Sequence, residues 1–308
     1  MNAIVLAGGK GSRLMPLTSY LAKPMLTVAS VPMLDYVTSQ LAYYNLKNVV
    51  YAVAYKKEQI ISRAKGYENI KSEFSIDDVP LGTAGSVKKA LPLLSDTFVV
   101  VSGDCLNDID LSALIKAHSK SNNDVTIAVV EREDTRKYGV VKLDKFNQVI
   151  SLIEKPQTNE YGNLINAGVY VVNKRIFNDF DDGMLDFAKD VFPILVQKGK
   201  IGAYFNKGFW TDIGAVEDYY QANFYMKDRT FFPLVKNGDE KCEKRNGNLI
   251  SKSASIYGTT KNSIVGANAT IQSGVNVLNS VILAKSTVKS SCQNCIVGQD
   301  FSLSVSLK

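Results

Sequence analysis

The chain has 308 residues, 45% of them hydrophobic, and a formal net charge of +6. This length predicts one large domain or two ordinary ones, and the hydrophobic content excludes a disordered chain. The lysines and arginines are scattered along the sequence rather than gathered in one tract. We therefore expect no nucleic-acid partner, whereas a small anionic substrate fits the positive charge.

The sequence carries no signal for a membrane or for secretion. No run of about 18 apolar residues is present, so we expect no membrane span. The first residues lack the basic segment and the long apolar core of a signal peptide. These features predict a cytoplasmic protein.

The few cysteines and the single histidine limit the catalytic mechanisms that the chain can use. We expect reduced thiols at all four cysteines: Cys105, Cys242, Cys292 and Cys295. The single histidine, His118, lies in a polar helical stretch at residues 111–121, and we predict that it is a surface residue. A mechanism built on a catalytic histidine is therefore disfavoured.

A glycine-rich loop follows the first predicted strand. Residues 3–7 are mostly apolar, and residues 8–11 contain three glycines. Glycine lets a backbone turn sharply and bring its N–H groups close to a ligand. Arg13 and Lys23 add positive charge within reach of the same loop. A strand that ends in such a loop predicts a phosphate-binding site.

Helices and strands alternate through the next hundred residues. The apolar pattern predicts helices at residues 32–44, 57–65 and 80–91, and strands at residues 48–54, 71–76 and 97–101. This order predicts an α/β sheet with right-handed crossovers, whose ligands lie at the carboxyl ends of the strands. The glycine loop and Asp104 both fall at that edge.

Closely spaced strands follow from residue 124 onward. We predict strands at residues 125–130, 139–143, 148–154, 166–172 and 202–205, and helices at residues 187–197 and 216–226. The short connections indicate that antiparallel pairs make the sheet mixed. We place a first domain at residues 1–230, a linker at residues 231–247 and a second domain at residues 248–308.

The last segment, residues 248–308, has a different pattern of apolar residues. From Ile250 to Val297, aliphatic residues recur at intervals of about five to eight, as in irregular hexapeptide repeats of a left-handed β-helix. An irregular β-rich tail is the alternative. A short stack with an open end needs a partner surface, so we expect a homo-oligomer, with the β-helix as a candidate contact.

Two common phosphate-binding motifs do not fit the glycine loop. The dinucleotide pattern G-x-G-x-x-G needs a third glycine where this chain has Leu14. It also needs an acidic residue after the second strand, which here ends in Tyr55 and Lys56. The P-loop pattern G-x-x-x-x-G-K-[ST] has no match.

A series of short motifs runs in order along the chain: Gly8-Gly9-Lys10-Gly11-Ser12-Arg13-Leu14, Lys23-Pro24-Met25, Gly103-Asp104, Tyr138-Gly139-Val140-Val141, Glu154-Lys155-Pro156, Asn166-Ala167-Gly168 and Trp210-Thr211-Asp212-Ile213-Gly214. Together they resemble the signature of the sugar-1-phosphate nucleotidyltransferases, the NDP-sugar pyrophosphorylases. The resemblance implies a Rossmann-like mixed-sheet catalytic domain followed by a short left-handed β-helix. It spans nearly the whole chain.

The resemblance also implies a reaction, in which a sugar 1-phosphate attacks the α-phosphorus of a nucleoside triphosphate and expels pyrophosphate. Positioning and charge neutralisation dominate such transfers. The implied catalytic residues are Arg13, Lys23 and Asp104. The implied nucleotide-binding residues are Leu6, Ala7, Gly8, Gly9, Gly11, Ser12, Gly82, Thr83 and Gly103. The implied sugar-phosphate residues are Gly139, Glu154, Lys155, Asn166 and Gly168.

The same resemblance implies that Asp104 and Asp212 bind Mg²⁺, a hard cation that prefers carboxylate oxygens. An alternative role for Asp212 is to cap the helix that begins near residue 216.

Residues 81–85, with the sequence LGTAG, bear on the choice of base. This segment most resembles the mannose-1-phosphate guanylyltransferases and is similar to the LGTGG of heptose 1-phosphate guanylyltransferases. Free amides and the Thr83 hydroxyl at a helix N-terminus suit the acceptors of a purine. We therefore favour GTP and mannose 1-phosphate. Heptose 1-phosphate with GTP, or glucose 1-phosphate with dTTP, UTP or ATP, are the alternatives.

Two other functional classes fit less well. A catalytically silent subunit that senses nucleotide sugars usually has a damaged loop, whereas the residues of this loop and Asp104 are intact. An acyltransferase built on a hexapeptide stack needs more turns and a catalytic histidine in that region, which is absent.

Overall fold

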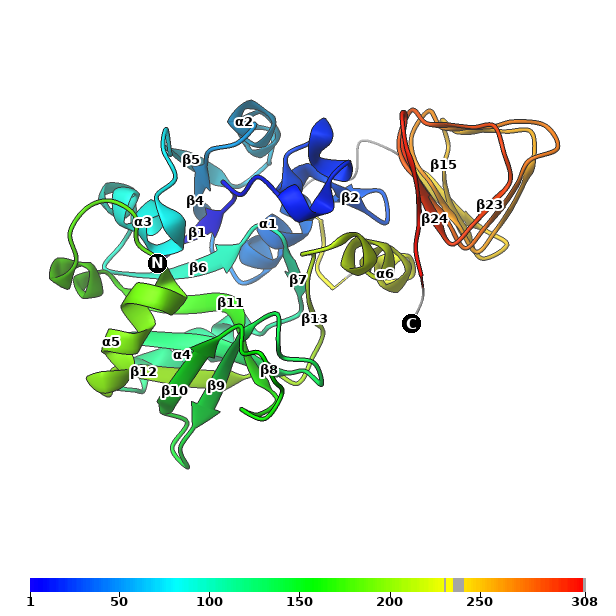
Figure 1. Cartoon of the computed structure of the whole chain (residues 1–308). Helices are drawn as coiled ribbons and strands as arrows, with labels where there is room; N and C mark the ends of the chain where they lie inside the picture. The colour runs from blue at the N-terminus through cyan, green and yellow to red at the C-terminus, as the bar shows by residue number, and fades with distance from the viewer. Residues whose placement is uncertain (230, 235–240, 307–308) are drawn as a thin grey trace. The chain divides into compact units, whose positions relative to one another are not determined.

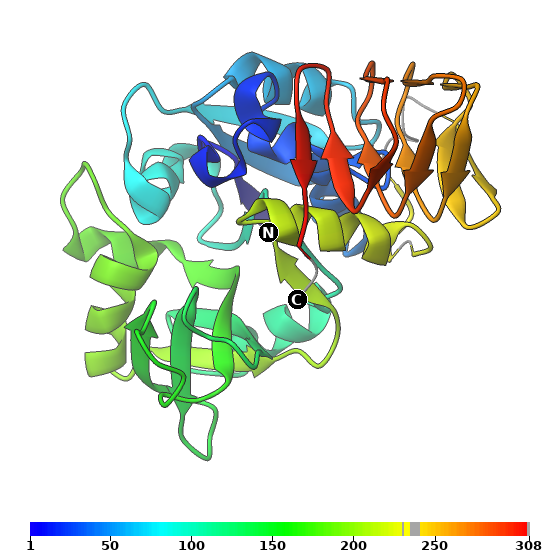
Figure 2. The same ribbon diagram turned by 45° about the vertical axis from the view of Figure 1, so that its right-hand side comes forward.

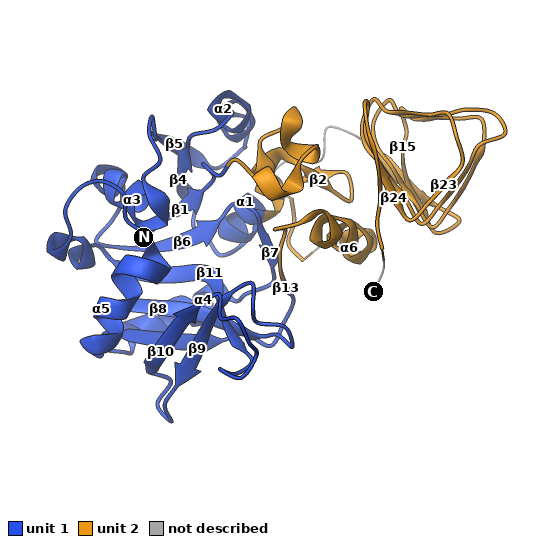
Figure 3. Cartoon of the chain, viewed as in Figure 1, with its two compact units in different colours: residues 1–9, 37–210 blue, residues 10–36, 211–308 orange. Residues whose placement is uncertain are grey.

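A nine-stranded mixed sheet organises residues 1–9 and 37–210, the first of two compact units (Figure 1, Figure 3). The second unit contains residues 10–36 and 211–308. The computed structural model describes residues 1–229, 231–234 and 241–306. Residues 10–36 therefore cluster with the C-terminal region, and the predicted domain boundary near residue 230 stays a prediction.

The parallel half of the sheet surrounds the first strand. In order across the sheet, its strands are β6 (Thr97–Ser102), β1 (Asn2–Leu6), β4 (Asn48–Val53) and β5 (Lys71–Ile76). Val5 pairs with Val101 on one side and with Tyr51 on the other. The apolar runs of β1, β4 and β6 are buried on both faces, as expected for parallel strands, whereas the edge strand β5 is mostly half-buried.

The antiparallel half begins at β11 (Leu164–Asn173), which pairs antiparallel with β6. The other strands of this half are β8 (Val125–Glu131), β9 (Gly139–Leu143), β10 (Val149–Glu154) and β12 (Ile201–Phe205). β12 runs parallel to β8, and β9 and β10 form an antiparallel pair. The mixed sheet expected from the short connections is confirmed.

The helices lie close to the predicted ranges. They are α1 (Met33–Tyr43), α2 (Lys57–Lys65), α3 (Gly82–Lys89), α4 (Leu111–Ser119), α5 (Phe192–Gln197) and α6 (Val216–Met226). A π-helical turn, Phe187–Val191, precedes α5. Within the part of the chain that the structure describes, no helix is long and apolar enough to cross a bilayer.

The position of His118 corrects one expectation. His118 is only 6% exposed, not a surface residue, because it follows Leu111 and Leu114 on the buried face of α4. Its Nδ1 lies 2.9 Å from Thr126 Oγ1, and its Nε2 lies 3.2 Å from Asn173 Oδ1. Burial lowers the pKa of His118, so its ring is a neutral packing element of the fold.

The C-terminal part of the second unit is a three-sided stack of short parallel strands, consistent with the left-handed β-helix that was predicted; Figure 1 shows its three sides and Figure 2 the row of strands along one side. Its first side contains β15 (Asn248–Ser251), β18 (Ile264–Val265), β21 (Val281–Ile282) and β24 (Cys295–Val297). The second side contains β16 (Ser255–Ile256), β19 (Thr270–Ile271) and β22 (Thr287–Val288). The third contains β17 (Thr259–Lys261), β20 (Asn276–Leu278) and β23 (Cys292–Gln293).

Pairing register fixes the coil length. Leu249 pairs with Ile264, Ile264 with Val281 and Val281 with Ile296, so successive coils hold 15, 17 and 15 residues. The repeat is therefore irregular and shorter than three hexapeptides. Several corners of the coils have a left-handed backbone conformation, which asparagine tolerates better than most other non-glycine residues. Asparagine occupies this conformation at Asn262, Asn268, Asn279 and Asn294.

Antiparallel strands close both ends of the first side. β14 (Cys242–Arg245) pairs with β15, although it lies in the predicted linker, and β25 (Ser302–Ser304) pairs with β24.

The same unit also contains α6, the hairpin of β2 (Thr27–Val28) and β3 (Val31–Pro32), and three short 3₁₀ turns, Ser12–Leu14, Leu17–Ser19 and Lys23–Met25. The hydroxyl of Tyr219 on α6 donates to the carbonyl of Thr27, and that of Tyr220 donates to the carbonyl of Asn279.

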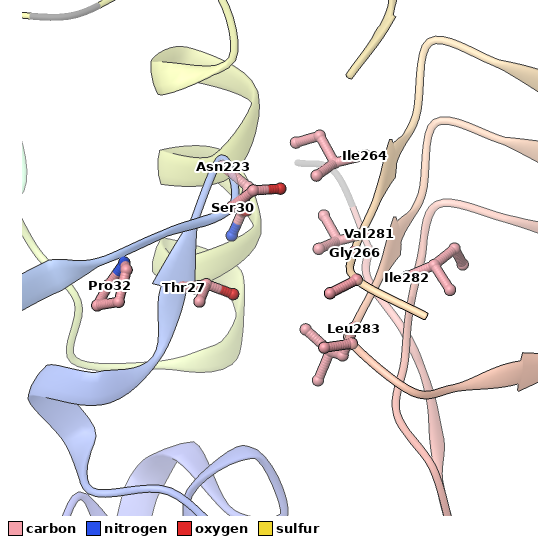
Figure 4. A pocket seen from close by; sticks show the side chains of 11 residues that line it. Thr27, Ser30, Pro32, Asn223, Ile264, Gly266, Val281, Ile282 and Leu283 are labelled. Atoms are coloured by element: carbon pink, nitrogen blue, oxygen red, sulfur yellow. The ribbon is translucent and has the colours of Figure 1, made fainter. Parts of the chain in front are cut away.

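A small pocket of about 140 Å³ lies within this second unit (Figure 4). Ile264 and Val281 line it from the β-helix, Thr27 and Pro32 from the β2–β3 hairpin, and Asn223 from α6. None of the residues that line it is among the predicted site residues.

Candidate active site

The glycine loop leaves β1 at Leu6 and Ala7, where the Ala7 N–H donates to the carbonyl of Ala52. Gly8 passes close to the neighbouring strand end, because a Cβ there would lie 3.2 Å from the Cβ of Ala54. At Gly9, in contrast, a Cβ would meet nothing within 4 Å. The backbone at Gly9 is therefore open to an approaching ligand.

Gly11 sets the second half of the loop. Its φ is +63°, and a Cβ there would lie 3.0 Å from Thr18 Cγ2 and 3.2 Å from Lys23 Cβ. The Thr18 hydroxyl donates to the Gly11 carbonyl over 3.0 Å. These contacts need a glycine. Ser12 and Arg13 follow on the 3₁₀ turn and are both exposed.

Lys23 and Asp212 come together in the second unit. Lys23 is 8% exposed, and its Nζ lies 3.9 Å from Asp212 Oδ1. A Cβ at Gly214 would lie 2.9 Å from Asp212 Oδ2 and 3.6 Å from an Arg13 guanidinium nitrogen. The structure therefore groups Arg13, Lys23 and Asp212, and their contact with phosphates stays a prediction.

The alternative role for Asp212 is taken by another residue. Ala215 occupies the N-cap of α6, and its N–H donates to Asp218 Oδ2 over 2.8 Å. An aspartate inside the first turn thus caps this helix, which also places a negative charge at the favourable end of its dipole.

Gly103 and Asp104 follow β6 directly. The Gly103 N–H donates to the Leu6 carbonyl over 2.9 Å, and a Cβ at Gly103 would lie 3.0 Å from that same oxygen. Glycine is therefore required by the packing of the two strand ends. Asp104 is half-buried at the carboxyl edge of the parallel sheet, the edge at which such folds bind ligands.

The two carboxylates predicted to bind Mg²⁺, Asp104 and Asp212, supply only oxygen donors, and both are partly accessible. This donor chemistry fits a hard cation that retains water and phosphate ligands. Asp212 also lies beside Lys23, so one predicted metal ligand is paired with one of the cations predicted to face the phosphates.

The segment at residues 81–85 differs from expectation. The Thr83 hydroxyl donates to Asp186 Oδ2 over 3.0 Å and accepts from the Phe187 N–H. The Leu185 carbonyl accepts from the N–H groups of both Ala84 and Gly85. The Thr83 hydroxyl and the N–H groups of Ala84 and Gly85 are therefore engaged within the protein, and the predicted roles of Gly82 and Thr83 in nucleotide binding stay predictions.

The glycines of this segment serve packing. A Cβ at Gly82, whose φ is +72°, would lie 2.5 Å from the Leu185 carbonyl oxygen. A Cβ at Gly85 would overlap the Gly183 carbonyl oxygen. Asp186 fastens the segment and also accepts from the N–H groups of Ala188 and Lys189. Asp186 belongs to none of the sequence motifs. Its position, as a polar residue directly before a predicted helix, was the one sequence signal that could have indicated a helix cap.

On the predicted sugar side, Glu154 packs against Gly139. A Cβ at Gly139 would lie 3.0 Å from Glu154 Oε2, so the bare glycine makes room for this carboxylate. Lys155 is exposed, has a φ of +48°, and places its Nζ 3.1 Å from Glu154 Oε1. Its N–H donates to the carbonyl of Tyr138. The Tyr138-Gly139 and Glu154-Lys155 motifs are thus side by side.

Asn166 sits at an irregularity in β11, where the register with β8 shifts between Asn166 and Tyr170. Its Oδ1 accepts from the Gly168 N–H, and its Nδ2 donates to the Tyr170 hydroxyl over 3.0 Å. Gly168 has a φ of +72°. The amide is held in one orientation by these two bonds and keeps one N–H available for a ligand.

Sequence reasoning missed Tyr170. It is fully surrounded by the core, and burial raises the pKa of its hydroxyl. The neutral hydroxyl therefore serves to orient Asn166. Trp210 is a second such residue, because its Nε1 donates to the Ala167 carbonyl over 2.8 Å and ties two of the sequence motifs together.

Comparisons with known proteins identify the family of this chain. A family model described as nucleotidyl transferase matches residues 2–229. A mannose-1-phosphate guanyltransferase from Aspergillus oryzae is 34% identical over 227 residues, which are 71% of this chain and 62% of that protein. The mannose-1-phosphate guanylyltransferase of Mycobacterium tuberculosis is 30% identical over 302 residues, 95% of this chain and 82% of that protein.

A solved structure adds to these matches. HddC from Yersinia pseudotuberculosis is 30% identical, has a TM-score of 0.65, and covers 73% of this chain and 99% of its own. It has also been solved in complex with GMP-PN. The chain spans less than two thirds of the length of the Aspergillus relative. The family prediction is confirmed, and this chain belongs to the nucleotidyl transferase family.

Proposed function

We propose that this protein transfers the guanylyl group of GTP to mannose 1-phosphate and releases pyrophosphate. The observation that carries this proposal is the similarity, across the sheet domain, to proteins named mannose-1-phosphate guanyltransferase. The solved complex of HddC with GMP-PN supports guanine as the base. Glycines placed for backbone approach at residues 8–11 and the cluster of Arg13, Lys23 and Asp212 support a triphosphate.

In this reaction a phosphate oxygen of the sugar 1-phosphate forms a bond to the α-phosphorus of GTP. The bond from that phosphorus to the bridging oxygen of the β-phosphate breaks, and pyrophosphate leaves with the electron pair. Such a transfer needs little acid or base assistance, so protein groups act by placing the reactants and balancing charge. Lys23 is the buried cation best suited to the α-phosphate, and exposed Arg13 to the outer phosphates.

Mg²⁺, held by Asp104 and Asp212, would neutralise phosphate charge when bound. Asp104→Asn keeps the size of the side chain but removes its charge, so we expect most turnover to be lost at an unchanged unfolding temperature. Binding of Mn²⁺ in place of Mg²⁺, followed by electron paramagnetic resonance, provides a readout independent of turnover. Near-normal activity and ion binding in this variant would remove Asp104 from the metal site.

On the sugar side, Glu154 accepts hydrogen bonds from sugar hydroxyls, and the free N–H of Asn166 donates to another. Gly139 brings the backbone close to the ring, and Lys155 contacts the sugar phosphate. The geometry that supports this proposal is the packing of Glu154 on Gly139 and the fixed orientation of Asn166.

The decisive experiment measures pyrophosphate release for GTP, ATP, dTTP and UTP, each with mannose, glucose and heptose 1-phosphates. We expect the highest kcat/KM with GTP and mannose 1-phosphate. A clear preference for another triphosphate would overturn the assignment of guanine as the base. A preference for heptose 1-phosphate would change the proposed sugar substrate from mannose 1-phosphate to heptose 1-phosphate. Binding of nucleotide sugars without turnover in any pairing would indicate a silent sensing subunit.

We further propose that the protein works in the cytoplasm as a homo-oligomer that associates through its β-helix. The second and third sides of the stack support this, because among the described residues their end strands have no further strand beside them, and uncovered strand edges favour association. Light scattering after size exclusion tests it. A mass of one chain at micromolar concentration would contradict the proposal.

A further inference from the structure

The loop that carries Arg13 and Lys23 belongs to the same compact unit as the β-helix (Figure 3). That unit combines residues 10–36 with residues 211–308, from the far end of the sequence. The two cations predicted to face the phosphates therefore have neighbours that no local pattern links to them. The contacts of the loop within this unit decide where the cations lie.

Short-range bonds give residues 11–19 of this loop a fixed shape. The Thr18 hydroxyl donates to the Gly11 carbonyl, and the Leu14 N–H donates to the same carbonyl over 2.9 Å. Thr18 and Leu14 are fully buried. The loop is therefore one small body, and a contact at its end positions all of it.

Tyr20 makes such a contact. It is 65% exposed, so burial does not hold it in place, and its hydroxyl donates to Asp300 Oδ2 over 3.1 Å. The bond to this carboxylate raises the pKa of the Tyr20 hydroxyl, which therefore stays a neutral donor. A hydrogen bond to a charged acceptor is stronger than one between neutral groups. The contact joins residues that are 280 positions apart in the sequence.

Asp300 lies on a tight turn at the end of the β-helix. The turn joins β24 to β25, which are paired antiparallel on either side of it. The Gly298 N–H donates to the Phe301 carbonyl over 2.9 Å, and the bare glycine leaves the space that the Phe301 ring occupies. The turn is thus fixed by strand pairing and by its own packing, so Asp300 is a firm acceptor for Tyr20.

A second anchor follows Lys23 in the sequence. The hydroxyl of Tyr219 on α6 donates to the Thr27 carbonyl over 2.7 Å. The next residue of the same helix, Tyr220, donates to the carbonyl of Asn279 in the β-helix. Lys23 is therefore held from both sides by contacts that lead to the β-helix, one direct and one through α6.

We propose that the β-helix positions the phosphate-binding loop, and that Tyr20 and Asp300 are positioning residues for the nucleotide. Their hydrogen bond holds Arg13 and Lys23 close to their working places before the triphosphate binds, so less ordering is left for the binding step. This inference rests on the proposed function in one respect, that the loop binds a triphosphate. It gives the β-helix a role in the reaction in addition to its proposed role in association.

Tyr20→Phe removes the hydroxyl and leaves the ring. We expect the KM for GTP to rise about 3- to 10-fold, the effect of one largely exposed hydrogen bond to a charged group, at an unchanged KM for mannose 1-phosphate. Tyr257→Phe, at a β-helix tyrosine that is 69% exposed, is the matched control and leaves both constants unchanged. A merely structural role for Tyr20 would lower the midpoint of urea denaturation and leave the KM for GTP unchanged.

Asp300→Ala removes the acceptor, and the variant with both substitutions completes a double-mutant cycle. We expect the double variant to have the same KM for GTP as either single variant, because all three lack the same bond. Effects that multiply would show that Tyr20 and Asp300 act independently. That result, or an unchanged KM for GTP in a folded Tyr20→Phe, overturns the proposal.

Trypsin provides a readout that needs no turnover. Arg13 is an exposed cleavage site in the loop, and a loop that has lost an anchor opens to a protease more often. We expect cleavage after Arg13, without nucleotide, to be at least about 3-fold faster in Tyr20→Phe than in the unmodified protein or Tyr257→Phe. Equal rates overturn the role of Tyr20. Failure of the unmodified protein to use GTP would instead overturn the proposed function, while the cleavage rates still decide whether Tyr20 holds the loop.

Discussion

Two glycine-rich segments, residues 8–11 and residues 82–85, look alike in the sequence and differ in the structure. In the first segment, Gly9 faces open space and Gly11 makes room for the side chains of its own loop. In the second, both glycines are pressed against the backbone at residues 183–185. The first segment is arranged for access to a ligand, and the second for close packing of two chain segments.

This difference shows that a high glycine content does not by itself identify a ligand-binding loop. A missing side chain serves a ligand only where the space it leaves is open. Where another backbone fills that space, the glycine holds two elements together.

Loss of the buried cation beside the first segment has the largest expected effect. Lys23→Ala removes a charge paired with Asp212 and a side chain packed on Gly11. We expect kcat to fall about 10²–10³-fold, the usual cost of removing one group that stabilises charge in a transition state. Steady-state pyrophosphate release measures it. Lys252→Ala, at an exposed lysine of the β-helix, is the control and retains full activity.

Alanine at one glycine of each segment tests the comparison directly. Gly85→Ala forces backbone apart, so we expect a loss of about 1–3 kcal/mol in the free energy of unfolding. Gly9→Ala meets no protein atom, so its stability stays within about 0.5 kcal/mol, while its KM for the nucleotide rises. Urea denaturation and steady-state kinetics provide the two readouts. The opposite pattern would break the distinction between the segments.

A smaller loss of stability is expected on substitution of Asp186, which is hydrogen-bonded to Thr83 in the segment at residues 82–85. Asp186→Ala removes the acceptor of the Thr83 hydroxyl and the cap of the turn at residues 187–191. We expect a loss of about 1 kcal/mol in the free energy of unfolding, as for other helix caps. Asp181→Ala, at an exposed position nearby in the sequence, serves as control. An unchanged midpoint in urea would show that Asp186 does not hold the segment.

The smallest expected effect is on the pH dependence of stability, through His118, which packs against strand β8 of the sheet. Burial lowers the pKa of His118 below its ordinary value of 6.5, so the unfolded chain takes up a proton at higher pH than the folded one. The contribution of His118 to stability is therefore complete above pH 6.5 and decreases as the pH falls toward the pKa of the folded state.

The test is urea denaturation at several pH values from about 7.5 to 5.5. His118→Gln, which cannot titrate, should show a weaker loss of stability on acidification than the unmodified protein. Equal slopes in the two proteins would show that His118 does not titrate during unfolding.

The sequence predicts the regular elements well because apolar runs and helical spacing are local signals. The helices Lys57–Lys65 and Val216–Met226 have their predicted ends. The error at His118 has a different origin. Its spacing from Leu111 and Leu114 already indicated the buried face of the helix, but the polar residues around it outweighed that signal.

The site was predictable only in part, for a physical reason. Lys23 and Asp212 are separated by 189 positions, and only the family motifs linked them before the structure showed their ion pair. No motif marked Asp186 or Tyr170, because each acts on a neighbour through contacts made by the fold. Partners created by tertiary packing leave no local pattern in a single sequence.

The antiparallel strands at both ends of the β-helix carry a consequence for how such chains change in length. The interior coils pair only with the coils directly before and after them, and β14 and β25 close the ladder of the first side. A coil of 15 residues duplicated between them would find the same neighbours on each side. The strand ladder of the first side can thus be lengthened or shortened in whole coils without a new kind of strand pairing.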